Sequence, residues 1–281
     1  MKLLDLHLGK PLTRGALTIY PIWNGQAVTT RGYDVTTQHL EVAERAGSAV
    51  VAELVLTNHG NRPALVLEGE LLEGGQQHRV ASRTVLVGAG TSQVLDVRCV
   101  EQGRWSGTAG HHRTGRLAPL TVRAAEGQRA TWERVQRFED RYDTSPTGSL
   151  LDATRNASSP AQQMVASLKP LPFQSGVLLC LAGQPIQLEA YDSPRTLAAG
   201  WKPLLEAAAL DALDLPPVFT PGRRARRFLD HLAHVPLQPQ DAGVGTGLQG
   251  RSDYARLGAL VWRNRAVHVA AINPRHELVM A

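Results

Sequence analysis

Two short stretches concentrate residue types that bind or transform small molecules. The first, at 67–79, reads LEGELLEGGQQHR, and the second, at 99–105, reads CVEQGRW. Carboxylates accept hydrogen bonds from hydroxyl groups, guanidinium groups form paired hydrogen bonds to phosphate, and an indole ring offers a stacking surface. The same residues would also serve as ion pairs around a tight turn, and the sequence leaves both interpretations open. The candidate ligand-binding residues are Glu70, Gln77, Arg79, Glu101, Arg104 and Trp105.

A hairpin turn is expected to position the first stretch. Gly74-Gly75 lies between two alternating segments, and glycine adopts the positive φ angles of a two-residue hairpin turn without strain. Such a turn places Glu70 opposite Arg79, and period-two alternation puts Glu68 on the same face. The simplest interpretation is a cross-strand charge ladder on a solvated face, contributing about 0.2–1 kcal/mol per pair.

The strand that ends at Glu101 is expected to extend this row. Sequential strands are usually neighbours, so this strand is predicted beside the second strand of the hairpin and antiparallel to it. That register brings Arg79 opposite Glu101 and continues the row to Glu70. Arg104 and Trp105 follow just beyond the strand. The row is a structural ladder if it is solvated, and a ligand anchor if it borders a pocket.

Signatures of catalysis and of metal binding are weak. His111 and His112 are adjacent, and neighbouring side chains of an extended loop point apart, so one ion is not expected to be held by both. No HExxH, CxxC, Walker loop or Gly-x-Ser-x-Gly elbow accompanies them. We therefore predict no metal and no cofactor. If the protein is an enzyme, Glu70 or Glu101 is the candidate general base.

The composition is that of a globular protein with a modest excess of basic residues. The 281 residues include 30 Lys and Arg against 25 Asp and Glu, for a formal net charge of +5, and 43% are hydrophobic. Only 5% are aromatic, so nucleic acid is not expected as a partner, and the basic run at 222–227 is interpreted as a solvated helix face. No apolar run reaches the about 18 residues of a membrane helix, and no signal peptide is recognised. We expect a cytoplasmic protein without a membrane partner, and the oligomeric state is left open.

Alternation and turn residues indicate a chain rich in short strands. The first 105 residues read as strands separated by regular turns, and an apolar repeat of three and four residues then predicts a helix at 132–142. Two similar hairpins follow, at 176–191 and 258–272, with helices between them. We predict an α+β, mostly β protein: an antiparallel β-sandwich with helices packed on one side.

The chain is expected to fold as one domain, residues 1–281, with two lobes. The N-terminal lobe, 1–143, is β-rich, and the C-terminal lobe, 160–281, contains the two β-hairpins and their helices. Residues 144–159 are rich in Ser, Thr, Pro, Gly and Asp and are interpreted as a connector. Each lobe is short of strands to close itself, so the two are expected to share one core.

Several short motifs together resemble an uncharacterised bacterial family named for its association with ADP-ribosylglycohydrolases and rhodanese/phosphatase proteins. The resemblance implies a link to ADP-ribose and NAD metabolism, and it makes a phosphate-bearing, nucleotide-like ligand the expected partner. It implies no catalytic residue. The segments that carry it are Leu67-Glu68-Gly69-Glu70, Gly74-Gly75-Gln76-Gln77-His78-Arg79, Cys99-Val100-Glu101-Gln102-Gly103-Arg104-Trp105, Ala190-Tyr191-Asp192-Ser193-Pro194 and Val267-His268-Val269.

Three functions remain consistent with the sequence. The first is a binding module for ADP-ribose or a related phosphorylated nucleotide, in which Arg104 takes phosphate and Trp105 stacks on the ligand. The second is a hydrolase acting on such a ligand. The third is an interaction or scaffold protein whose polar residues hold the sheet together.

Overall fold

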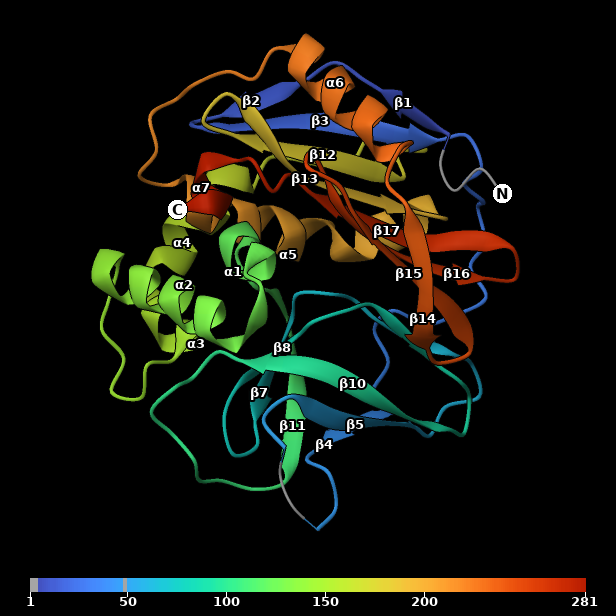
Figure 1. The fold of residues 1–281 in the computed structure, drawn as a ribbon, viewed down its shortest axis with the longest axis vertical. Coiled ribbons are helices and arrows are strands. Elements are labelled where there is room, and N and C mark those ends of the chain that lie inside the picture. Colours follow the sequence, from blue (N-terminus) through green and yellow to red (C-terminus); the bar gives the residue numbers. More distant parts are fainter. Residues whose placement is uncertain (1–4, 48–49) are drawn as a thin grey trace.

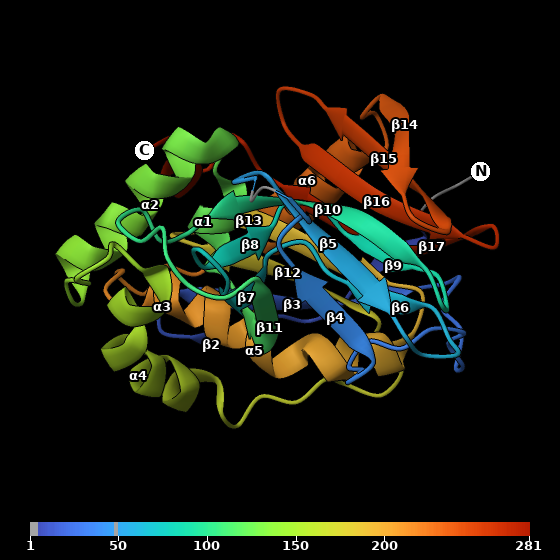
Figure 2. The same ribbon diagram turned by 90° about the horizontal axis from the view of Figure 1, so that it is seen from below.

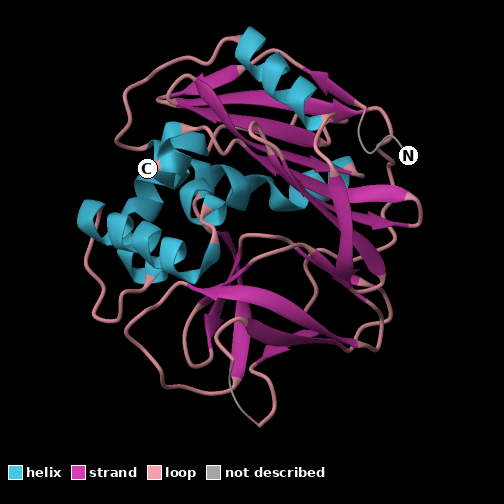
Figure 3. Cartoon of the chain, in the orientation of Figure 1, coloured by secondary structure: helices cyan, strands magenta, loops and turns pink. Residues whose placement is uncertain are grey.

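A computed structural model describes residues 5–47 and 50–281, and its architecture is mostly β with antiparallel strand pairing (Figure 3). Figure 1 shows three parts: a large sheet, a small barrel and a group of helices between and beside them. The predicted α+β, mostly β class is confirmed. Among the described residues, no helix is long and apolar enough to cross a membrane.

Nine of the described strands form one large antiparallel sheet in the order β1-β3-β12-β13-β17-β16-β15-β14, with β2 paired to β3 beside this path. Both predicted hairpins are confirmed, as β12–β13 and β16–β17. The sheet also joins the N-terminal strands to the later hairpins, because β3 pairs with β12. The strands are β1 Leu6–Leu8, β2 Leu12–Arg14, β3 Leu17–Asn24, β12 Gly176–Leu181, β13 Gln184–Tyr191, β14 Leu237–Ala242, β15 Gly245–Arg251, β16 Arg256–Trp262 and β17 Arg265–Ile272.

Six further strands close into a barrel in the order β10-β5-β4-β11-β7-β8, where the sequence analysis predicted a sandwich (Figure 2). Closure depends on β11, which pairs with both β4 and β7. Its sequence, GHHRTGRL, has no apolar alternation and gave no strand signal. The barrel strands are β4 Leu40–Ala43, β5 Glu53–Asn58, β7 Glu70–Gly74, β8 Arg79–Ala81, β10 Ser92–Cys99 and β11 Gly110–Leu117; β6 Ala64–Val66 and β9 Val85–Val87 form a separate pair.

Helices cover both faces of the large sheet. The apolar side of α5 packs with residues such as Leu179 and Val267 in the core between sheet and barrel, and α6 packs through Phe228 against Leu178 on the outer face (Figure 1). The prediction that the helices lie on one side is therefore wrong for α6. The helices are α1 Leu120–Ala124, α2 Gly127–Arg141, α3 Leu150–Ala153, α4 Arg155–Val165, α5 Pro194–Ala212, α6 Gly222–Leu232 and α7 Glu277–Met280.

The expected connector at 144–159 contains α3 and the start of α4. Ser149 begins α3 because its hydroxyl accepts the N–H of Asp152, which is the usual role of serine at a helix N-terminus. The division into lobes at 1–143 and 160–281 stays a prediction, and β3 pairs with β12 across it.

Candidate functional site

The turn after β7 is longer than predicted. Gly74 and Gly75 do have positive φ angles, 113° and 58°, but β7 pairs with β8 as Leu72 opposite Arg79, so Glu70 does not face Arg79. The predicted register was wrong by two residues. Two side chains bond to the backbone of this wider loop: His78 Nδ1 accepts the N–H of Gly74 at 3.1 Å, and Glu44 Oε1, from far away in sequence, accepts the N–H of Gln76 at 3.1 Å.

The next strand pair was predicted correctly in direction and wrongly in register. β8 and β10 are antiparallel, and Arg79 lies opposite Cys99, not opposite Glu101. β10 ends at Cys99, and Glu101 instead forms a single β-bridge with Ser149. The proposed row of Glu70, Arg79 and Glu101 across three strands is therefore absent from the described structure.

Glu101 and Arg104 form a closed ion pair. Glu101 is buried and accepts Nε and Nη2 of Arg104 at 2.8 and 2.6 Å, the backbone N–H of His78 at 2.9 Å and the hydroxyl of Thr147 at 2.8 Å. Arg104 Nη1 also donates to the carbonyl of Gly75 at 2.8 Å. Burial by itself raises the pKa of Glu101, but these donors outweigh it, so the pKa is lowered. Both charges are thus used to hold turns.

Glu70 lies apart from this pair. Its carboxylate accepts Nε and Nη2 of Arg113 on β11, the second at 2.9 Å. This two-pronged ion pair ties β7 to β11 and uses both carboxylate oxygens. Of the six predicted site residues, Glu70 is the one that the fold places elsewhere.

The remaining predicted residues gather at one end of the barrel. Arg79 is fully buried, donates Nη1 to Gln77 Oε1 at 3.2 Å and lies beneath the ring of Trp105, 5.9 Å from its centroid. Trp105 is 53% exposed. We call Gln77, Arg79, Glu101, Arg104 and Trp105 the barrel-end cluster.

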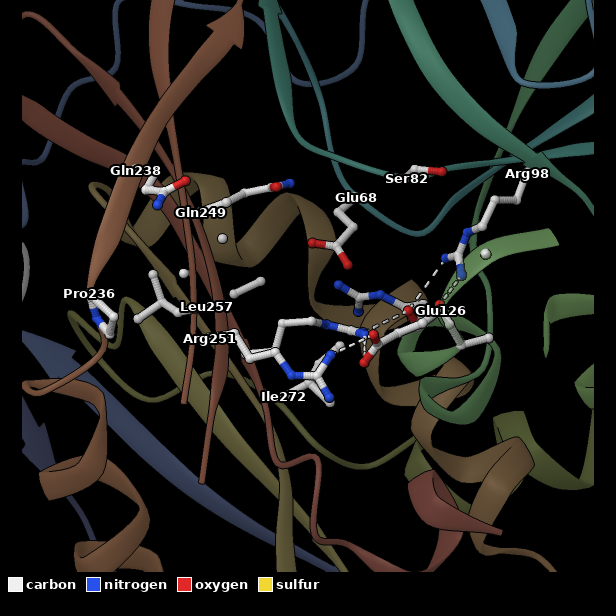
Figure 4. Close-up of a pocket in the computed structure, with 17 residues that line it drawn as sticks. Glu68, Ser82, Arg98, Glu126, Pro236, Gln238, Gln249, Arg251, Leu257 and Ile272 are labelled. Carbon is white, nitrogen blue, oxygen red and sulfur yellow. Dashed lines mark hydrogen bonds and ion pairs between the residues drawn. The ribbon is translucent and has the colours of Figure 1, made fainter. Parts of the chain in front are cut away.

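A separate cleft of about 780 Å³ lies between the barrel and the large sheet (Figure 4). None of the barrel-end cluster lines it. Its residues come from the barrel side, from the α1–α2 junction and from the face of the large sheet. They are Glu68, Ser82, Arg98, Arg123, Ala125, Glu126, Gly127, Pro236, Gln238, Gln249, Gly250, Arg251, Arg256, Leu257, Gly258, Ala270 and Ile272.

Strand register explains how the sheet contributes the floor of the cleft. Residues directly opposite each other on paired strands share a face. One such row runs through four strands as Gln238, Gln249, Gly258 and Ala270, and it continues to the buried Glu189 on β13. A second row, two residues along, consists of Arg251, Arg256 and Ile272.

The basic wall of the cleft is built around the junction of α1 and α2. Arg98 donates to the carbonyl of Ala125, and Arg256 donates to the carbonyl of Ala124 at 3.0 Å. Because carbonyl groups at a helix C-terminus lack partners within the helix, these arginines satisfy them. Arg251 and Arg256 also form ion pairs with the exposed carboxylate of Glu126, at 2.6 and 2.9 Å. Burial lowers the pKa of Arg98 to about 10, so it stays charged near neutral pH.

Arg123 connects this wall to a buried polar network. It is 1% exposed, and its Nη2 lies 2.5 Å from Oε1 of Glu189. Two other nitrogens of Arg123, Nε and Nη1, have no hydrogen-bond partner among the described residues. Gly69 makes room for this side chain, because a Cβ there would overlap Arg123 Nε.

The network then runs from the sheet back to the barrel. Oε2 of Glu189 lies 2.5 Å from Nε2 of His268, and Nδ1 of His268 lies 2.8 Å from the hydroxyl of Thr84. That hydroxyl accepts the backbone N–H of Glu68 at 3.0 Å, and the ring of Tyr191 stacks on His268 with centroids 4.8 Å apart. These bonds hold the two sides of the cleft together at its base.

Comparison with known families accounts for the motifs. Residues 5–272 match the ARPP-1 domain, described as the ARG and Rhodanese-Phosphatase-superfamily-associated Protein domain. The chain belongs to this family. The resemblance predicted from the sequence is confirmed, and three of the segments that carried it meet in this ARPP-1 domain at the buried network, through Gly69, Tyr191 and His268. Comparisons with curated proteins and with solved structures give no match.

Sequence reasoning missed most of the residues that line the cleft of this ARPP-1 domain. Arg98, Arg123, Arg251 and Arg256 come from four separate segments, and each alone resembles an ordinary surface arginine. One signal was available: Gly258 stands inside an otherwise apolar strand, a position where glycine often marks a close approach to the backbone. Within residues 5–47 and 50–281, no group of three or more His, Cys, Asp or Glu is arranged to hold a metal ion.

Proposed function

We propose that this ARPP-1 domain is a cytoplasmic small-molecule binding protein whose cleft takes ADP-ribose or a related phosphorylated nucleotide, in a role linked to NAD and ADP-ribose metabolism. The observation that carries the proposal is Arg123, a buried guanidinium in the cleft lining with two N–H nitrogens that no described residue satisfies. Buried donors of this kind are normally paired, so a missing acceptor is expected at this place.

The phosphate end of the ligand belongs at the basic wall. Arg251 and Arg256 present guanidinium groups beside each other on neighbouring strands, and arginine binds phosphate through paired hydrogen bonds. Gly127, the first residue of α2, and Glu126, which precedes it, also line the cleft, and no side chain caps that helix N-terminus. Free N–H groups at the start of a helix attract anions. The two arginines and the helix N-terminus therefore face one cavity, and the carboxylate of Glu126 neutralises part of their charge.

The barrel-end cluster is the alternative location for the same ligand. Arg79 and Trp105 would supply a cation beneath a stacking surface there. Arg79 also has two buried nitrogens, Nε and Nη2, without a hydrogen-bond partner among the described residues. The cluster is less suited to the role, because Nη2 of Arg79 lies 3.8 Å from a carboxylate oxygen of Glu44, and because Glu101 and Arg104 already satisfy each other and neighbouring backbone groups. The cleft is the location that we propose.

A hydrolase with Glu70 or Glu101 as general base is less well supported. Glu70 is engaged by Arg113 through both oxygens, and the lowered pKa of Glu101 makes that carboxylate a weaker base. A scaffold role would leave the unpaired nitrogens of Arg123 without an explanation. We therefore favour binding without catalysis.

Isothermal titration calorimetry with ADP-ribose, NAD and AMP tests this proposal. Arg251→Ala removes one arginine whose side chain is paired with the exposed Glu126, so the fold should tolerate it. Losing one charge-assisted hydrogen-bond partner costs about 1.5–3 kcal/mol, or about 10- to 150-fold in Kd. Arg129→Ala, at a 93% exposed side chain outside the cleft, is the charge-matched control and should bind as the unmodified protein does. Absence of heat with all three ligands at millimolar concentration would refute the proposal, as would an unchanged Kd in Arg251→Ala.

A further inference from the structure

We propose that the sheet floor of the cleft, the row Gln238–Gln249–Gly258–Ala270, is a slot for a flat heterocyclic base, so that the ligand class is a nucleoside phosphate and neither a sugar phosphate nor free phosphate. This inference rests on the proposed function and adds the part of the ligand that distinguishes one phosphate compound from another. It is carried by the residue types along the row and by their register.

Backbone geometry does not explain why position 258 is a glycine. It lies inside β16, and its φ angle is not among the positive ones that favour glycine. Glycine in a strand interior destabilises the fold by about 0.5–1 kcal/mol relative to alanine, so the fold itself gains nothing from it. A Cβ at this position would meet no atom closer than Oε2 of Glu68, at 3.8 Å. The missing side chain therefore leaves free space in the cleft.

The neighbours of Gly258 give that space a flat floor with a carboxylate at its edge. Ala270 continues the small floor on β17, directly opposite Gly258. Oε2 of Glu68 lies 3.8 Å from the position of a Cβ on Gly258, and the carboxylate of Glu68 has no hydrogen bond to a described residue. A planar group can lie flat on this floor of glycine and alanine beside the carboxylate of Glu68, where a bulky, non-planar group makes less contact.

Two amides stand at the open end of the slot. Gln238 and Gln249 are directly opposite each other on β14 and β15, are exposed, and make no side-chain hydrogen bond to a described residue. Each carries two N–H donors and a carbonyl acceptor. A phosphate offers acceptors only, whereas the edge of a heterocyclic base offers donors and acceptors together. The amide pair therefore matches a base better than it matches a second phosphate.

The distance between the two rows suits one sugar. Arg256 lies two residues from Gly258 along β16, which at the rise of an antiparallel strand is about 7 Å. A single pentose spans that separation between a base and its phosphate. The carboxylate of Glu68 would then accept hydrogen bonds from the sugar hydroxyls, and it would repel a phosphate placed over the floor.

Gly258→Val is the decisive substitution, because it fills the slot without touching the basic wall. Valine favours strands, and its Cβ would meet no atom closer than 3.8 Å at this position. We expect Gly258→Val to raise the Kd for AMP and ADP-ribose at least tenfold and to leave the Kd for pyrophosphate within twofold. Thr246→Val, at an exposed position of β15 outside the cleft, is the matched control and should change neither. Gln249→Leu, which keeps the floor, should raise the Kd for AMP at least fivefold with pyrophosphate unchanged.

The outcomes separate this inference from the proposed function. If Gly258→Val binds AMP and ADP-ribose as the unmodified protein does while Arg251→Ala weakens both, the base slot is wrong and the phosphate site stands. An equal loss of pyrophosphate binding in Gly258→Val would also overturn the slot. If the unmodified protein binds none of these compounds, both proposals fall. Should Gly258→Val lose its native circular dichroism spectrum, Gln249→Leu decides alone: a selective loss of AMP supports the slot, and an unchanged Kd for AMP refutes it.

Discussion

Replacing Glu189 with glutamine should expose how much the buried network stabilises the fold. Glu189 is 1% exposed and is contacted at 2.5 Å by Arg123, His268 and the amide of Gln187. Removing one partner of a buried ion pair leaves the other charge uncompensated, which typically costs about 3–5 kcal/mol. Since domains are stable by only about 5–15 kcal/mol, Glu189→Gln should remove a large part of the total stability.

The pKa of Glu189 leads to a similar magnitude. Burial by itself raises this pKa, but the charges of Arg123 and His268 outweigh it and hold the pKa at about 2, below the ordinary value of 4.5. At about 1.4 kcal/mol per pKa unit, that difference corresponds to about 3 kcal/mol. Because the folded-state pKa is the lower one, this stabilisation is fully present above pH 4.5 and is lost as the pH falls toward 2.

Urea unfolding between pH 3 and pH 7.5 measures both effects. The unmodified protein should lose about 2 kcal/mol through this carboxylate between pH 5 and pH 3, and Glu189→Gln should lack that component. Glu133→Gln is the control, since its i,i+4 pair with Arg129 is exposed and such pairs contribute about 1 kcal/mol or less. A cost for Glu189→Gln below 1 kcal/mol, or an unchanged acid dependence, would refute the reasoning.

Three further predictions concern stability and titration. Glu101→Gln should lower the unfolding free energy by about 1–3 kcal/mol and leave the Kd for ADP-ribose unchanged, whereas a changed Kd would return the ligand to the barrel end. Gly69→Ala, at a φ of 85° and against Arg123, should lower the melting temperature more than Gly90→Ala, which has a φ of 66° and open space; equal shifts would contradict the packing role of Gly69. Burial raises the pKa of Asp211 to about 6, so its carboxyl carbon should titrate near pH 6 by ¹³C NMR. A titration midpoint near pH 4 would show that water reaches this carboxyl group.

Local patterns predicted the hairpins of the large sheet well. The turns at Ala182-Gly183 and Arg263-Asn264 have positive φ at both residues, the geometry of a two-residue turn that closes two matching strands. Such hairpins are determined by neighbouring residues, so sequence reasoning was able to find them. The barrel required a strand, β11, whose polar sequence carries no alternation.

The register errors have a non-local cause. Two-residue closure at Gly74-Gly75 was a sound expectation from those residues alone, but the wider loop that forms is bonded at Gln76 by Glu44, which lies about thirty residues earlier and which local patterns do not reveal. The same limit applies to the cleft. Its floor is a row of residues from four strands, and only the register of the whole sheet reveals that Gln238 and Ala270 belong to one surface.

A crystal structure of the protein with bound ADP-ribose would test the central claim most directly. The account predicts density in the cleft, with the phosphates at hydrogen-bonding distance from Arg251 and Arg256 beside the first turn of α2, and the adenine against Gly258. Density at the barrel end instead, beneath Trp105 and beside Arg79, would contradict it.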